Sequence, residues 1–147
     1  MHDHTHHMKR NPRESVSSNM TTIPTTINID DKLAPFDATW TPHIIAELNN
    51  QQVKLAKIEG EFTWHDHADE DELFLVLTGR INMQMRDEQG QLHEQAVEPG
   101  EIIVIPRGLQ HNPIADPGTS VLLFEPSATK HTGDKITDRT VTDQQMI

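Results

Sequence analysis

Three histidines and one glutamate in the middle of the chain have the residue types and the spacing of a metal site. His65 and His67 are two residues apart, and side chains two apart on a β-strand point to the same face. Glu72 begins the next apolar segment, and His111 follows a turn at 106–108. Three neutral imidazoles and a carboxylate suit a divalent first-row metal ion, and an ion with five or six ligands keeps positions open for water or substrate. For an isolated His-x-His pair we would favour two half-exposed polar residues on a strand, but here the pair is accompanied by Glu72 and His111.

The composition narrows the chemistry and the partners. The chain of 147 residues has no cysteine, so thiolate metal sites and disulfides are excluded. Its net charge of -11 argues against nucleic acid or an anionic membrane surface as a partner. No apolar run approaches the ~20 residues of a membrane span, and no signal-peptide core follows the N-terminus. We therefore expect a cytoplasmic protein that binds neither nucleic acid nor membrane.

Short apolar segments separated by turns predict an all-β fold. The expected strands cover 53–67, 72–78, 80–86, 92–97, 102–105 and 121–125. Residues such as those at 87–90, 99–100 and 116–118 form the turns, and strands do not alternate with helices, so the pattern favours an antiparallel sandwich or barrel. Before these strands, 44–48 reads as at most one helical turn.

The length of the chain allows one hydrophobic core, so we expect a single domain with flanking segments. We expect a disordered leader or purification tag at 1–19, an N-terminal arm that packs on the barrel at 20–50, the barrel at 51–127 and a C-terminal tail at 128–147. Leu73 to Leu77 and Ile102 to Ile105 are apolar at consecutive positions, so both of their faces need cover. A second copy of the chain or the arm would supply that cover, and we expect a homodimer.

Several further residues are candidates for the barrel interior. Lys57 shares strand parity with His65 if no bulge intervenes, and would then be a candidate catalytic base or anion-binding group. A surface lysine is an equally good interpretation. By the same alternation of faces, we expect four residues to line the pocket. These are Phe74, Val76, Met83 and Met85.

The spacing of these residues resembles the two conserved motifs of the cupin family. The first motif is matched by Gly60, His65, His67, Glu72 and Gly79, and the second by Gly100, Pro106, Gly108 and His111. Two positions depart from the pattern: four residues rather than five separate Gly60 from His65, and Ala115 replaces the final asparagine. Neither is a ligand position. The resemblance implies a double-stranded β-helix, or jelly-roll barrel, that holds one divalent ion through the three histidines and Glu72.

A wider resemblance is to small cupins grouped with mannose-6-phosphate isomerase. It is carried by the segments 53–57, 71–76, 106–108 and 132–134. Such a fold does not fix an activity. We expect a metal-binding cupin that binds a small organic molecule at a Zn, Fe, Mn, Ni or Co ion, as a metal-dependent isomerase or dioxygenase. The alternative is a non-catalytic binding or sensing module with the same metal site.

Overall fold

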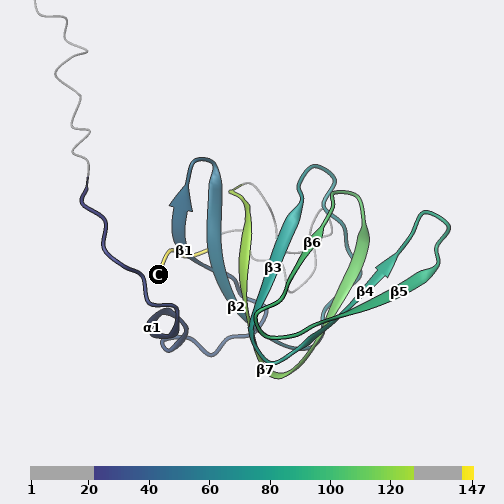
Figure 1. Ribbon diagram of the computed structural model, residues 1–147, viewed down its shortest axis with the longest axis horizontal. Coiled ribbons are helices and arrows are strands. Elements are labelled where there is room, and N and C mark those ends of the chain that lie inside the picture. Colours follow the sequence, from purple (N-terminus) through teal and green to yellow (C-terminus); the bar gives the residue numbers. More distant parts are fainter. Residues whose placement is uncertain (1–21, 128–143) are drawn as a thin grey trace, which may run out of the picture.

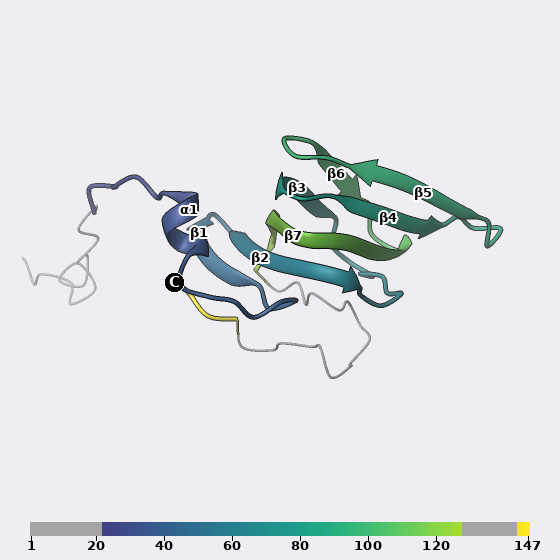
Figure 2. The ribbon, with the colours of Figure 1, turned by 90° about the horizontal axis from the view of Figure 1, so that it is seen from below.

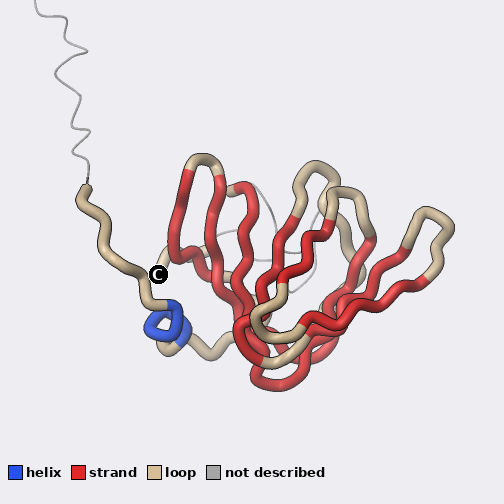
Figure 3. Tube along the Cα trace, viewed as in Figure 1, coloured by secondary structure: helices blue, strands red, loops and turns tan. Residues whose placement is uncertain are grey.

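The computed structural model describes residues 22–127 and 144–147, and this part of the chain is nearly all β-structure (Figures 1 and 3). Every pairing between the named strands is antiparallel, which confirms the all-β jelly-roll prediction. The elements are α1 (Ile29–Leu33), β1 (His43–Leu48), β2 (Gln51–Glu61), β3 (Glu72–Thr78), β4 (Ile81–Arg86), β5 (Leu92–Val97), β6 (Ile102–Ile105) and β7 (Gln110–Pro126).

The long strand β7 holds the barrel together. It pairs with β2 on one side, while on its other side its first half pairs with β4 and its second half with β3. Between Ala115 and Thr119 the register with β2 shifts, and Gly118 has the left-handed φ of 77°. The turn predicted at 116–118 is therefore a bulge inside one bent strand, because its neighbours continue the ladder on both sides.

The strands follow the order β1-β2-β7-β3-β6, with β4 between β5 and β7. In Figures 1 and 2, α1 and β1 lie at one side of the molecule and β5 at the other. Side chains on β3 alternate between buried and half-buried, as expected for a strand with one face on the core. The core consists of Trp40, Ala56, Ile58, Phe74, Val76, Ile81, Met83, Val97, Ile105, Ala115, Val121 and Leu123.

The strand β1 corrects the prediction of a helical turn at 44–48. The β-branched pair Ile44 and Ile45 is buried, and β1 pairs with β2. The residues at the end of the chain add further backbone bonds: the Ile44 N–H donates to the Gln145 carbonyl (2.8 Å), and the Ile147 N–H donates to the Ile44 carbonyl (2.9 Å). These pairings from distant segments decide the local structure and are not visible in the local sequence.

The strand β2 ends earlier than predicted, at Glu61 rather than at His67. Its register with β7 shifts between Ile58 and Gly60, and Gly60 has a φ of 76°. The chain then leaves the ladder, and of the two following histidines only His65 forms a bridge, to His111. The two histidines thus lie in the loop that follows β2, and strand alternation alone does not set the orientation of their side chains.

The outer surface of β6 is apolar and exposed. The side chains of Ile102 and Val104 are 60% and 52% exposed in the single chain. None of the described helices is long and apolar enough to cross a membrane. The predicted leader at 1–19 and the segment 132–134 lie outside the described residues.

Candidate metal site

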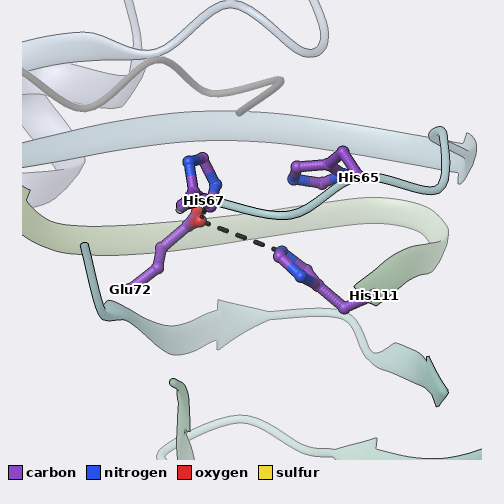
Figure 4. A group of neighbouring side chains, drawn as sticks. All are labelled: His65, His67, Glu72 and His111. Carbon is purple, nitrogen blue, oxygen red and sulfur yellow. Dashed lines mark ion pairs between the residues drawn. The ribbon is translucent and has the colours of Figure 1, made fainter. Parts of the chain in front are cut away.

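The four predicted ligands lie together in the barrel (Figure 4). Glu72 is the first residue of β3, and His111 is the second residue of β7. The backbones of His65 and His111 exchange two hydrogen bonds, of 3.0 and 2.9 Å. The carbonyl of His67 accepts a hydrogen bond of 2.8 Å from the Gly108 N–H. Backbone pairing thus holds the histidine loop against the turn that precedes β7.

Two of the imidazoles have a defined tautomer. The Nδ1 atom of His65 lies 2.8 Å from the Thr63 carbonyl oxygen, and Nδ1 of His111 lies 2.8 Å from that of Leu109. A carbonyl oxygen only accepts, so each Nδ1 carries the proton and donates it. In the neutral ring the Nε2 atom then has a free lone pair, which is the form that binds a metal ion.

The inward atoms of the four side chains converge without hydrogen bonds among the described residues. Each residue offers one ligand atom, and these atoms all lie within 4.8 Å of one another. Glu72 Oε2 lies 2.6 Å from His67 Nε2 and 3.9 Å from His111 Nε2. The first of these distances is that of an ion pair, but by hydrogen-bond geometry the Nε2 atoms of the three histidines and Glu72 Oε2 have no partner among the described residues. Four unpartnered polar atoms around one point are expected of ligands that share a cation.

The electrostatics of the cluster favour two neutral imidazoles, those of His65 and His111, beside an ionised carboxylate. Burial, reinforced by the neighbouring His111, lowers the pKa of His65 to about 4. Burial also lowers the pKa of His111. Although burial alone would raise the pKa of Glu72, the imidazoles, His67 foremost, hold it below its usual value. Burial alone would lower the pKa of His67, but Glu72 raises it. Two imidazoles are thus ready to donate lone pairs at neutral pH.

The residues present fit a divalent cation. Three nitrogens and one oxygen form a mixed set that first-row ions such as zinc, iron, manganese, nickel or cobalt accept. A dication would also give a partner to every orphaned atom of the cluster. In the described part of the chain, Glu72 is the single carboxylate of this group. Asp71, its neighbour, instead accepts a hydrogen bond from the Arg107 N–H (2.9 Å) and holds the turn.

An apolar cavity of about 30 Å³ adjoins the cluster. Of the four residues predicted to line the pocket, Phe74 does so, whereas Val76 and Met83 are fully buried in the core and Met85 lies beside a different hollow near His93. The cavity is lined by Trp40, Pro42, Ala56, Ile58, Phe62, His65, Glu72, Phe74, Pro113, Val121 and Leu123.

Lys57 does not join the metal cluster. Its Nζ donates to the Phe36 carbonyl (2.6 Å) and lies 5.0 Å from the centre of the Phe36 ring. The strand β2 ends at Glu61, so strand parity does not carry over from Lys57 to His65. The even-numbered residues of β2 between 54 and 58 are buried, and Ala56 and Ile58 among them line the cavity.

The interior lysine is Lys54, which sequence reasoning missed. Its Nζ lies 2.7 Å from Glu125 Oε1, and both side chains are almost completely buried. Burial, together with the nearby Glu72 carboxylate, raises the pKa of Glu125 to about 7, although Lys54 partly offsets this rise. The signal was present in β2, because Lys54 shares its parity with Ala56 and Ile58.

The fold and the site together define a small antiparallel barrel with a buried histidine and carboxylate cluster suited to a metal ion. The family model described as "Cupin domain" matches residues 51–126, and the chain belongs to this family. A cupin-2 domain-containing protein from Shewanella frigidimarina has a similar structure, with 42% identity and a TM-score of 0.63 over 68% of this chain and 93% of that one.

Two further proteins are similar to this chain. The protein NMB1881 from Neisseria meningitidis has 29% identity and a TM-score of 0.60, over 70% of this chain and 100% of that one. The Bacillus subtilis protein YdbB, described as uncharacterized, is 36% identical over 67 residues, or 46% of this chain. That match spans 56% of the Bacillus protein. These similarities support the family and leave the activity open.

Proposed function

We propose that this protein binds one divalent first-row metal ion through His65, His67, Glu72 and His111, and that a small organic molecule binds at the open positions of the ion. The observation that carries the proposal is the convergence of four buried ligand atoms without hydrogen-bond partners among the described residues. When bound, such an ion supplies Lewis acidity or, as iron, a centre for oxygen chemistry. The protein supplies the ligands, their tautomers and the shaped cavity.

The lining of the cavity bears on the kind of activity. Apart from His65 and Glu72, each residue that lines it within the described ranges is apolar. An isomerase needs a group that takes and returns a proton, and Lys57 is directed elsewhere. This favours plain binding or metal-centred oxygen chemistry over isomerisation. The grouping with mannose-6-phosphate isomerase remains a prediction from the sequence.

Cobalt(II) and a small chelator test the proposal. The chain used is a leader variant, with His2, His4, His6 and His7 changed to Ala, so that these histidines do not compete for the metal. We expect one Co(II) per chain, and a change in its visible absorption when acetohydroxamate, which chelates through two oxygens, is added. The same chain with His65→Ala and His67→Ala should give neither signal. If acetohydroxamate does not change the visible absorption of the Co(II)-loaded protein, the bound ion has no open positions for a ligand.

We also propose a homodimer formed through β6. The exposed side chains of Ile102 and Val104 lie on an edge strand of the sheet, where a second copy would cover them. Light scattering should give twice the chain mass of 16.7 kDa, and Val104→Lys should shift the mass toward that of one chain. A monodisperse monomer at micromolar concentration would contradict the dimer.

A further inference from the structure

Trp40 reaches the metal pocket from outside the family-matched barrel at 51–126. Its backbone has the left-handed φ of 56°, which a bulky residue adopts rarely because its Cβ crowds the neighbouring backbone. Two hydrogen bonds to β2 hold it there: its N–H donates to the Lys57 carbonyl (2.8 Å), and its indole Nε1–H donates to the Glu59 carbonyl (3.0 Å). The residue as a whole is 9% exposed. The surrounding structure thus fixes one orientation of a strained aromatic residue.

The ring of Trp40 begins an aromatic wall that ends at a metal ligand. It stacks on Phe62 with centroids 4.4 Å apart and an angle of 18° between the planes. Phe62 in turn meets the His65 ring edge to face, at 5.4 Å and 86°. All three rings line the cavity beside the cluster. A ligand bound at the open positions of a metal ion would therefore direct the rest of its body along this wall.

The cavity limits both the polarity and the size of that body. Its walls offer no polar side chain other than His65 and Glu72 in the described part of the chain, so a charged or hydrogen-bonding group would lose its water without compensation. Its volume of about 30 Å³ is far below the ~150 Å³ of an apolar cavity that accommodates benzene. We therefore expect a short alkyl group to be accommodated more readily than an aromatic ring, which would meet the Trp40 and Phe62 rings of the lining.

We propose that Trp40 is a specificity-determining residue, which restricts the ligand to molecules with a metal-chelating head and a short, uncharged alkyl body. This inference rests on the proposed metal-dependent binding. Trp40 acts by excluding larger groups, and the arm before the barrel therefore takes part in ligand selection. The Phe62 ring supports Trp40 from the barrel side.

Two hydroxamates with the same chelating head test the restriction in the Co(II)-loaded leader variant. We expect acetohydroxamate to bind at least tenfold more tightly than benzohydroxamate. Trp40→Ala should reduce this ratio at least tenfold, mainly because benzohydroxamate binds better. Trp40→Phe, which keeps an aromatic ring and serves if the alanine variant does not fold, should give a ratio between the two. The matched control is Trp64→Ala, because Trp64 lies against Arg86 and outside the cavity lining.

The outcomes separate this proposal from the one on which it rests. If Co(II) or acetohydroxamate does not bind to the leader variant, both proposals fail. If both bind, but the wild-type ratio is near one, favours benzohydroxamate or is unchanged in Trp40→Ala and Trp40→Phe, the role of Trp40 alone is refuted. An equal change of the ratio in Trp64→Ala would also refute it.

Discussion

Two groups of ionisable side chains are buried in the same barrel and differ in how their polar atoms are satisfied. In the first, Lys54 and Glu125 form an ion pair of 2.7 Å, and Oε2 of Glu125 is the one side-chain atom of the pair without a hydrogen-bond partner among the described residues. In the second, three Nε2 atoms and Glu72 Oε2 converge, and none of the four has a hydrogen-bond partner among the described residues, although Glu72 Oε2 lies 2.6 Å from His67 Nε2. The first group supplies its own cation, whereas the second has the form of a site that needs one.

The register of the sheet makes this division of charges necessary. Leu73 of β3 pairs with Phe124 of β7, so Glu72 and Glu125, the next residues along the ladder, are neighbours. Two adjacent buried carboxylates repel each other unless each has its own counter-charge. Lys54 serves Glu125, and we assign the metal ion to Glu72.

Removing two histidines should have the largest effect. Changing His65 and His67 together to Ala removes two of the four ligands, so we expect metal affinity to fall by about a thousandfold or more. The unfolding free energy of the metal-free protein should change little, since the backbone bonds to His111 and the apolar core remain. Isothermal titration with Zn(II) and urea unfolding measure the two effects. His93→Ala, at an exposed histidine paired with Asp87, is the control and should keep full affinity.

Breaking the ion pair should instead affect stability. Lys54→Met leaves Glu125 buried without its cation, and we expect the unfolding free energy of the metal-free protein to fall by about 3–5 kcal/mol at pH 8, above the pKa of about 7 that Glu125 has beside Lys54. Changing both residues, Lys54→Met with Glu125→Leu, should restore most of this loss, because no unpaired charge remains. Urea unfolding of the metal-free variants measures both. A double variant no more stable than Lys54→Met would show that the pair is not the source of the effect.

Neutralising Glu72 should weaken metal binding without abolishing it. Glu72→Gln keeps the size of the side chain but removes one negative charge from the ion, so we expect about a ten- to hundredfold loss of affinity. The loss should be smaller than that of the double histidine variant. The control is Glu70→Gln, in the same loop but outside the cluster. If Glu72→Gln keeps its metal affinity and Glu70→Gln loses it, the carboxylate ligand is Glu70 in the loop and not Glu72.

The smallest effect concerns the pH dependence of stability. The pKa of Glu125 is raised from 4.5 to about 7 in the folded protein, so the folded state holds this proton at pH values where the unfolded state has lost it. This group therefore lowers stability as the pH rises from 4.5 to 7, by on the order of 2 kcal/mol. Metal-free wild type should lose this amount relative to the Lys54→Met, Glu125→Leu double variant when both are unfolded in urea across that range. If the difference in unfolding free energy between the two proteins stays constant across this pH range, the pKa of Glu125 is not raised by burial.

The four converging side chains could be predicted from the sequence because their spacing matches that of the cupin motifs. His65, His67 and Glu72 are close in the chain, and the turn before His111 completes the set. Most strand positions were also predictable, since alternation and turn residues mark them. The strands β3, β5 and β6 have the predicted bounds.

What the sequence did not reveal depends on pairing between distant segments. The strand β2 ends at Glu61, before the histidines, so counting parity back from His65 selects Lys57, whereas Lys54 is the buried lysine. The strand β1 forms because β2 and the end of the chain supply its hydrogen bonds. Trp40 enters the pocket through a left-handed turn that no local pattern marks.

The most direct test of the account is the metal content of the barrel itself. The leader variant, purified without chelator and then offered Zn(II), Mn(II), Fe(II), Co(II) and Ni(II) in turn, is analysed for metal after gel filtration. We predict one ion per chain with at least one of these metals, and none after His65→Ala and His67→Ala are added. A wild-type barrel that retains no stoichiometric amount of any of them would contradict the assignment of the four converging side chains as metal ligands.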